Sequence, residues 1–499
     1  MKRIRDIVKM RGAKGVGANN CRETAFGERA RYSSLHFSPL TLTMKTSLVS
    51  FSSPKAYNTM STMSLTRSFV FACTLLLSMS LSSAQNQPVA PANYDETKVP
   101  KFELPDALKT IDGQNVDSPK LWNDVRRHEL LKLFEEQMFG KSPLPLEPTH
   151  HSEATGLTFS LHGGPVTANY SGNGTRYQVH LSIHKRGEDP KDDDPTIDVL
   201  IYTPNNVKGK IPAFIGLNFQ GNHTVDDDPG IWLGKIWKDK QLIPASEQER
   251  GAQKSRWCIE KILNRGYAVI TAYYQDIEPD FDGGSKFGIR RMIDQKGEPD
   301  EGNAIATWAW GLELIRDWMV HFRDLNLDPD KIIVHGHSRL GKTALWAGAT
   351  NPKFAMVISN DSGCGGAALS RREFGETVHR INTSFPHWFC GNFKKYNLDV
   401  NALPFDQHEL IALIAPRPVY IASAAEDQWA DPKGEFLSGL YADPVYRLLG
   451  TDGIGGVTEM PEVNKSVGGT IGYHVRTGKH DITEYDWEQY LNFADKHLR

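Results

Sequence analysis

Four compact apolar runs, each bounded by turn residues, constrain the fold of this chain most strongly. They are IPAFIGLNF (211–219), YAVITAYY (267–274), KIIVHGHS (331–338) and PRPVYIASAAED (416–427). Segments with helical spacing separate them, as in residues 304–323, where apolar side chains recur about every fourth position. Buried strands that alternate with helices predict the α/β class, with a mostly parallel central sheet in a three-layer α/β/α sandwich.

The segments before these runs extend the same prediction. Residues 119–139 place apolar side chains at helical spacing and are followed by Gly140, which predicts a helix. Residues 175–185 and 196–204 alternate between apolar and polar side chains, as antiparallel strands do. No internal repeat or low-complexity break follows, so we expect one catalytic domain over residues 106–499.

Composition excludes one large class of partner. The chain has 57 Lys and Arg against 60 Asp and Glu, with a net charge of −3, which provides no strong field for a polyanion. We therefore expect no nucleic-acid partner.

The N-terminal part has the pattern of an export signal. Arg67 precedes an apolar run over residues 68–81, and small residues follow up to Ala84, so we expect a signal peptide and a mature start near Gln85. The run is too short for a membrane span, and we expect no membrane anchor. Residues 1–59 fit poorly ahead of such a signal, which favours Met44, Met60 or Met63 as the first residue.

Two further expectations concern the exported protein. Export places it in the periplasm or outside the cell. Residues 85–105 are rich in Pro, Asn and Lys and are typical of a linker or an extended arm.

The run KIIVHGHSRLGKTALWAGA (331–349) raises the question of a nucleophile. A buried strand is followed by Gly336, Ser338 and Gly341 and then by a helix starting near Lys342, a spacing close to G-x-S-x-G. A sharp turn there places the hydroxyl of Ser338 at the carboxyl edge of the sheet, and the free N–H of Arg339 beside it can meet an oxyanion. An ordinary serine in a tight turn is the alternative.

A nucleophilic serine needs a base and an acid. In the order serine, acid, histidine, the base precedes the last helix, and His480 lies there, with His474 as its rival. Two carboxylates follow buried strands and are candidates for the acid, Asp427 and Asp361. At this point the residues leave the choice between them open.

Five separated stretches then resemble a known family. They are GHSRLGK, NDSGCGGAALSRR, HWFCGNFKKY, LPFDQHELIALIAPRPVYIASAAEDQWADP and GKH, all between residues 336 and 480, and the resemblance as a whole covers about residues 102–499. In this order they resemble the motifs of the glucuronoyl esterases, carbohydrate esterase family 15. His337 stands where fungal members carry cysteine, as in the bacterial branch.

The resemblance implies an α/β-hydrolase fold and a serine esterase of the 4-O-methyl-glucuronoyl methylesterase type, without metal or other cofactor. The implied substrate is an ester of (4-O-methyl-)glucuronic acid in glucuronoxylan with lignin alcohols, cleaved through an acyl-enzyme. Ser338 is the implied nucleophile, His480 the base, and Arg339 an oxyanion-stabilising side chain.

The resemblance also bears on the acid and on the sugar. Some members have a glutamate 23 residues after the serine, where this chain has the shorter Asp361, and others use the later acid, which corresponds to Asp427. We favour Asp427, with Asp361 as support or substitute. The implied contacts to the sugar are Lys342, Trp429 and Glu376.

Other interpretations remain. Each of three side chains has an alternative role: Arg339 as a surface ion-pair partner, Lys342 as a charge at a helix N-terminus, and Trp429 as a core residue. For the whole protein, the alternatives are another exported carbohydrate esterase, of acetyl-xylan or feruloyl type, or a non-catalytic glycan-binding relative. We expect a monomer, because no exposed apolar repeat is evident.

Overall fold

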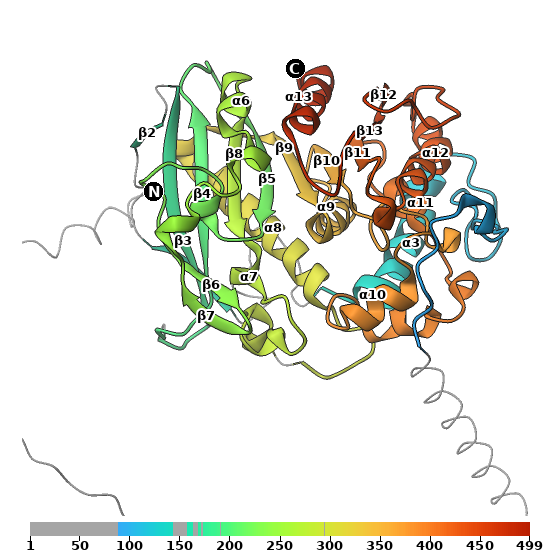
Figure 1. Cartoon of the computed structure of the whole chain (residues 1–499), viewed down its shortest axis with the longest axis horizontal. Helices are drawn as coiled ribbons and strands as arrows, with labels where there is room; N and C mark the ends of the chain where they lie inside the picture. Colours follow the sequence, from blue (N-terminus) through green and yellow to red (C-terminus); the bar gives the residue numbers. More distant parts are fainter. Residues whose placement is uncertain (1–87, 143–156, 163–167, 171–172, 190, 294) are drawn as a thin grey trace, which may run out of the picture. The chain divides into compact units, whose positions relative to one another are not determined.

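The structure, a computed structural model, describes residues 88–142, 157–162, 168–170, 173–189, 191–293 and 295–499 (Figure 1). The expected signal peptide, the candidate start methionines and the proposed mature start at Gln85 lie outside the described residues. Among the described residues, no helix is both long enough and apolar enough to span a bilayer.

An eleven-stranded sheet forms the centre of the described part of the chain, in the order β1-β3-β4-β8-β5-β9-β10-β11-β13-β12, with β2 paired to β3 (Figure 1). Strands β8, β5, β9, β10, β11 and β13 are parallel, and the remaining pairings are antiparallel. The bounds are β1 Leu157–His162, β2 Ala168–Tyr170, β3 Gly174–Lys185, β4 Thr196–Pro204, β5 Ile211–Asn218, β8 Ala268–Tyr273, β9 Leu327–His337, β10 Met356–Asn360, β11 Val419–Ala424, β12 Val467–Gly468 and β13 Ile471–Arg476. A separate hairpin joins β6 Lys235–Lys238 to β7 Gln241–Pro244.

Each face of the sheet packs against its own hydrophobic core, because successive side chains of a strand point to opposite faces. In β9, which is parallel to both of its neighbours, Ile332 and Val334 belong to one core, whereas Ile333 belongs to the other. Both faces of the strand are buried, which is why the parallel part of the sheet reads as continuous apolar runs.

Helices cover both faces. Helices α8, α9 and α12 contribute to the first core, and α6 and α13 contribute to the second. The bounds are α2 Pro119–Leu121, α3 Arg127–Phe134, α5 Lys254–Trp257, α6 Ile259–Asn264, α7 Tyr274–Ile277, α8 Ala304–His321, α9 Arg339–Thr350, α10 Val378–Ser384, α11 Gln407–Ala412, α12 Pro432–Leu448 and α13 Glu484–Leu498. This arrangement confirms the predicted α/β class and the mostly parallel sheet between two helical layers.

The expected elements occur with small differences. The predicted helix over residues 119–139 is one helical run with two π-helical turns, Trp122–Arg126 and Glu135–Phe139, and it stops at Gly140, whose φ is 83°. Helix α9 starts at Arg339, earlier than expected, because the turn at Ser338 is completed within one residue. Strand β13 was not predicted from its sequence, since IGYHVR is short and interrupted by glycine and histidine.

The described part of the expected linker, residues 88–105, is here called the arm. Its Asn93 carbonyl accepts a hydrogen bond from the Gly375 N–H at 2.8 Å. The Glu96 carboxylate binds Arg372 at 2.6 Å and Lys433 at 2.8 Å. The arm therefore lies against the loop that leads to Glu376.

Candidate active site

Four side chains of interest follow four neighbouring parallel strands. Ser338 comes directly after β9 and Asp361 directly after β10, while Asp427 and His480 lie in the loops after β11 and β13. Because the carboxyl ends of parallel strands meet at one edge of a sheet, residues far apart in sequence come together there.

The turn at Ser338 is sharp and strained. Its φ of 58° and ψ of −129° lie outside the regions that side chains ordinarily adopt. A Cβ atom at Gly336 would lie 1.9 Å from the carbonyl oxygen of Leu340, so only glycine fits two residues before the serine. The Ser338 N–H donates to the Asn360 carbonyl at 2.9 Å, which ties the turn to the end of β10. This is the geometry of a nucleophile elbow.

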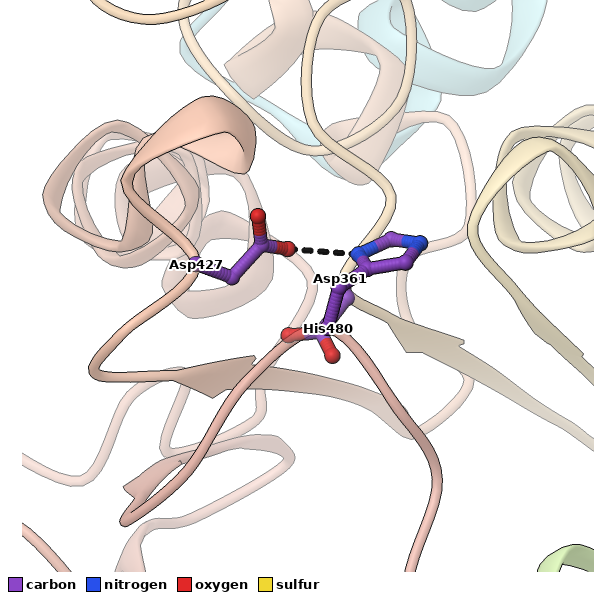
Figure 2. Close-up of side chains that lie close together, drawn as sticks. All are labelled: Asp361, Asp427 and His480. Carbon is purple, nitrogen blue, oxygen red and sulfur yellow. Dashed lines mark hydrogen bonds and ion pairs between the residues drawn. The ribbon is translucent and has the colours of Figure 1, made fainter.

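His480 and Asp427 form a direct pair. Nδ1 of His480 lies 2.6 Å from Oδ2 of Asp427. The dashed line in Figure 2 marks this contact. The side chain of His480 is 42% exposed, whereas Asp427 is buried. Two backbone hydrogen bonds join their loops, from Ala425 to Arg476 and from Glu426 to Gly478. The carboxylate can thus orient the imidazole and stabilise its protonated form.

Asp361 lies close to this pair but is engaged differently. Asp361, Asp427 and His480 lie close together (Figure 2). One potential metal-ligand atom from each, a carboxylate oxygen or a ring nitrogen, lies within 4.8 Å of the others. Oδ2 of Asp361 accepts the Asp481 N–H at 3.3 Å, and Oδ1 is buried without a hydrogen-bond partner among the described residues. Burial, together with the charges of Glu435 and Asp427, raises the pKa of Asp361 well above its usual value.

These three residues are the group, within the described part of the chain, whose donor atoms lie near enough to share a cation. The Nδ1 atom of His480 is already used by Asp427. The arrangement therefore resembles an acid–base pair more closely than a preformed metal site.

The ring of His337 packs beneath the base. Its centroid lies 4.5 Å from that of His480, and its Nδ1 lies 2.5 Å from Oδ1 of Asn360. Burial, aided by the nearby His480, lowers the pKa of His337 well below its usual value. His337 is therefore neutral and supports His480 without competing for its proton.

Arg339 lies beside the elbow, and its guanidinium packs against aromatic rings. Its guanidinium carbon is 4.7 Å from the centroid of Trp388, and one of its terminal nitrogens binds Asp280. The side chain is 28% exposed. Arg339 thus has an ion-pair partner, as the alternative interpretation expected. The pair lies beside the elbow, however, and its carboxylate is buried rather than at the surface.

Lys342 and Glu376 face each other within the same region. Nζ of Lys342 donates to the Ser362 carbonyl at 2.6 Å and lies 4.0 Å from Oε2 of Glu376. Both side chains are buried, which lowers the pKa of Lys342 and raises that of Glu376. Buried groups of this kind can serve as hydrogen-bonding partners of a polar ligand.

Trp429 is 38% exposed, so it is not a core residue. The guanidinium of Arg380 lies 5.5 Å from its ring centroid. Its carbonyl accepts the Glu376 N–H at 3.0 Å, so the loop of Trp429 and the loop of Glu376 are joined.

Sequence reasoning missed several residues around this site. No role was expected for Asp280, Asn360, Arg380, His387 or Trp388, although the last two belong to the quoted stretch HWFCGNFKKY. Asn360 likewise begins the quoted stretch NDSGCGGAALSRR, so membership of a motif was the sequence signal for these three residues. Asp280 gave none, because the hydrogen bonds of its side chain are with residues at least 59 positions away, apart from Tyr274.

Comparisons with known proteins place these features in a family. The sequence profile of a family described as "Glucuronyl esterase, fungi" matches residues 258–450. Carbohydrate esterase MZ0003, from an unknown prokaryotic organism, is 50% identical over 416 residues, which cover 81% of this chain and 92% of that protein. The 4-O-methyl-glucuronoyl methylesterase 1 of Wolfiporia cocos is 33% identical over 192 residues, 37% of this chain and 47% of the relative.

Solved structures agree with these relatives. A promiscuous CE15 esterase from a marine bacterial metagenome is 48% identical, with a TM-score of 0.73, and the match covers 82% of this chain and all of that one. The glucuronoyl esterase from Solibacter usitatus is 44% identical, with a TM-score of 0.74, over 81% of this chain and all of that one. The chain therefore belongs to carbohydrate esterase family 15, the glucuronoyl esterases.

Proposed function

We propose that this protein hydrolyses esters of (4-O-methyl-)glucuronic acid through an acyl-enzyme on Ser338. The observation that carries the proposal is the 2.6 Å contact between His480 and Asp427 at the strand edge where Ser338 occupies a strained elbow. The names of relatives support the substrate class, since they include 4-O-methyl-glucuronoyl methylesterases and a glucuronoyl esterase.

In the proposed first step, the Ser338 hydroxyl attacks the carbonyl carbon of the ester. Nε2 of His480 takes the hydroxyl proton, and Asp427 stabilises the resulting imidazolium. The negative charge that develops on the carbonyl oxygen is stabilised by the N–H and the guanidinium of Arg339. The tetrahedral intermediate then collapses and the alcohol leaves with the proton from His480.

Water completes the cycle. His480 removes a proton from the water, which attacks the acyl carbon, and the uronic acid is released as Ser338 recovers its proton. Each step uses groups of this chain and water alone.

Lys342, Glu376 and Trp429 are the proposed contacts to the sugar. Lys342 and Glu376 offer a donor and an acceptor to hydroxyl groups, and the exposed ring of Trp429 offers an apolar face. The cationic Arg339 and Lys342 favour a hydroxyl-rich or acidic acyl group over a small apolar one such as acetyl.

The proposed setting follows from the sequence. A signal peptide ending at Ala84 exports the protein to the periplasm or the medium. Its partner there is glucuronoxylan esterified to lignin, and the protein acts as a monomer.

The test compares hydrolysis of benzyl glucuronate with that of p-nitrophenyl acetate. The wild type should prefer the glucuronate, and Ser338→Ala should abolish its cleavage. Asp427→Asn should lower kcat by about 10⁴-fold, as expected when a triad acid no longer holds its histidine, and Asp361→Asn should lower it less.

Other results would point elsewhere. Preference for the acetate would indicate an acetyl esterase, and the solved relative described as promiscuous makes this comparison worthwhile. A larger loss with Asp361→Asn would make Asp361 the acid. Absence of hydrolysis of either ester would favour a glycan-binding protein.

A further inference from the structure

The carboxylate of Asp280 collects four hydrogen-bond donors beside the elbow. Its Oδ1 accepts from Nε2 of His387 at 2.8 Å and from the indole N–H of Trp388 at 2.7 Å. Its Oδ2 accepts from the hydroxyl of Tyr274 at 2.8 Å and from Nη1 of Arg339. The side chain is only 4% exposed, so these donors take the place of water.

Asp280 remains ionised in this environment. Burial alone would raise the pKa of its carboxyl group, but the hydrogen bond from His387 and the charge of Arg339 outweigh burial and hold the pKa below its usual range. A permanent negative charge therefore faces Arg339 at neutral pH.

The guanidinium of Arg339 also lies among aromatic rings. Its carbon lies 4.7 Å from the centroid of Trp388, 5.5 Å from that of Phe385 and 5.9 Å from that of Phe219. Trp388 and Phe385 are themselves stacked, with centroids 3.8 Å apart and planes within 3°. Three rings around the group and a carboxylate at one of its nitrogens leave it little rotational freedom.

Another edge of the same group has no partner. Nε of Arg339 is buried, and no described residue accepts a hydrogen bond from it. Because a buried donor without a partner stabilises nothing, the guanidinium is held by its contacts with Asp280 and the aromatic rings.

We propose that Asp280 is a positioning residue for the reaction. By binding Nη1 and fixing the guanidinium against Trp388, it aims the remaining N–H groups of Arg339 at the oxygen on which negative charge develops. This inference rests on the oxyanion-stabilising role proposed for Arg339. It adds that the role depends on a residue 59 positions earlier, on the loop after α7.

The physical reason is preorganisation. A donor that is already aimed at the developing charge stabilises the transition state without reorganising, whereas a mobile arginine loses part of that stabilisation to ordering. Asp280 makes no contact with the substrate in this scheme, so its loss should lower kcat and leave KM nearly unchanged.

A double-mutant cycle on benzyl glucuronate hydrolysis tests the proposal. Arg339→Ala should lower kcat about 10²- to 10³-fold, as loss of one oxyanion donor does. Asp280→Asn should lower kcat by roughly tenfold or more in the wild-type background and by less than about twofold in the Arg339→Ala background. KM should stay within about threefold of the wild-type value.

A matched control separates positioning from general damage. Glu409 is also a buried carboxylate paired with an arginine, at 2.8 Å from Arg126, and its other side-chain hydrogen bond is accepted from the Asp406 N–H at the start of α11. Glu409→Gln should leave kcat of the folded enzyme unchanged. If Asp280→Asn does not fold, Asp280→Glu retains the charge one methylene further out and is measured in the same two backgrounds.

The outcomes are distinct. An equal loss of kcat in both backgrounds would show that Asp280 acts independently of Arg339 and would overturn the proposal, as would an unchanged kcat in Asp280→Asn. If Arg339→Ala retains full kcat while Ser338→Ala is inactive, the proposed role of Arg339 fails and the positioning role fails with it, but the serine mechanism stands.

Discussion

At the scale of single residues, Gly336 is the position of the elbow with the least room for a side chain. Adding a methyl group there brings it to 1.9 Å from the Leu340 carbonyl oxygen, a backbone atom that cannot move without displacing α9. Gly336→Ala should lower kcat by at least about 10²-fold and destabilise the fold by about 1–3 kcal/mol. Activity assays and urea unfolding measure both effects.

Gly234→Ala is the control for this substitution. A Cβ atom at Gly234 has ordinary contacts, the nearest being 3.4 Å from Asp198. Its activity and stability should match the wild type. A fully active Gly336→Ala enzyme would contradict the tight elbow.

Trp429 provides a second prediction at this scale. Its ring is 38% exposed, so Trp429→Ala removes little core packing but deletes an apolar face from the proposed sugar site. KM for benzyl glucuronate should rise by about three- to tenfold, equivalent to about 0.6–1.4 kcal/mol, with little change in kcat or in unfolding temperature.

Tyr441→Ala, at an exposed aromatic residue on α12, should leave KM unchanged. An unchanged KM for Trp429→Ala would remove that residue from the binding site.

At the scale of secondary-structure elements, Glu313 couples stability to pH. It lies on α8 and accepts hydrogen bonds from Thr350 and Asn351 at the end of α9, both at 3.0 Å. Burial raises the pKa of Glu313 to about 8. Between its ordinary pKa and about 8, the unfolded chain loses this proton while the folded chain keeps it, so stability falls as pH rises through that window.

The glutamine in Glu313→Gln cannot ionise, so the variant should lack this pH-dependent contribution to stability. Relative to the variant, the wild type should lose stability between pH 5.5 and pH 8.5, by about 1.4 kcal/mol for each unit of pKa difference within that window. Urea unfolding at the two pH values measures the difference. The exposed Glu260→Gln serves as control, and parallel pH curves for Glu313→Gln and wild type would contradict the assignment.

The arm is the second element with a testable role. Tyr94 packs edge-on against Phe374, with ring centroids 6.2 Å apart, and Glu96 binds Arg372 and Lys433. Replacing both Tyr94 and Glu96 by alanine should loosen the loop that leads to Glu376 and raise KM severalfold. Since Glu96 is 44% exposed, the cost of its ion pairs in stability should stay within about 1 kcal/mol.

Asp95→Ala tests whether the arm acts through these contacts. Among the described residues, Asp95 bonds to residues of the arm alone, such as Thr97 and Lys98. Asp95→Ala should leave KM unchanged. If it raises KM as much as the double substitution of Tyr94 and Glu96, the arm does not act through its specific contacts with Phe374, Arg372 and Lys433.

At the scale of the whole molecule, the prediction concerns processing. Residues 68–84 have the apolar run and the small final residues that signal peptidase requires. Expression from Met60 in a bacterial host should yield an exported protein whose mass corresponds to a start at Gln85. Ala84→Trp should block cleavage, and a mass that retains residues 60–84 in the wild type would contradict the proposal.

The sequence by itself determined the fold class and four buried strands of the parallel part of the sheet, β5, β8, β9 and β11. Strand and helix periodicity are local properties, so the buried runs and the helices between them are readable before any fold is known. The elbow is readable for the same reason, because Gly336, Ser338 and the start of α9 lie within a few residues of one another.

Only the tertiary structure decided what those elements place together. Asp361 and Asp427 both follow strand ends, and which of them meets Nδ1 of His480 depends on how two loops are joined by backbone hydrogen bonds. Likewise, Asp280 and Arg339 meet because β8 and β9 are separated by only one strand in the sheet. Such contacts depend on strand order and loop conformation, which no local pattern of residues encodes.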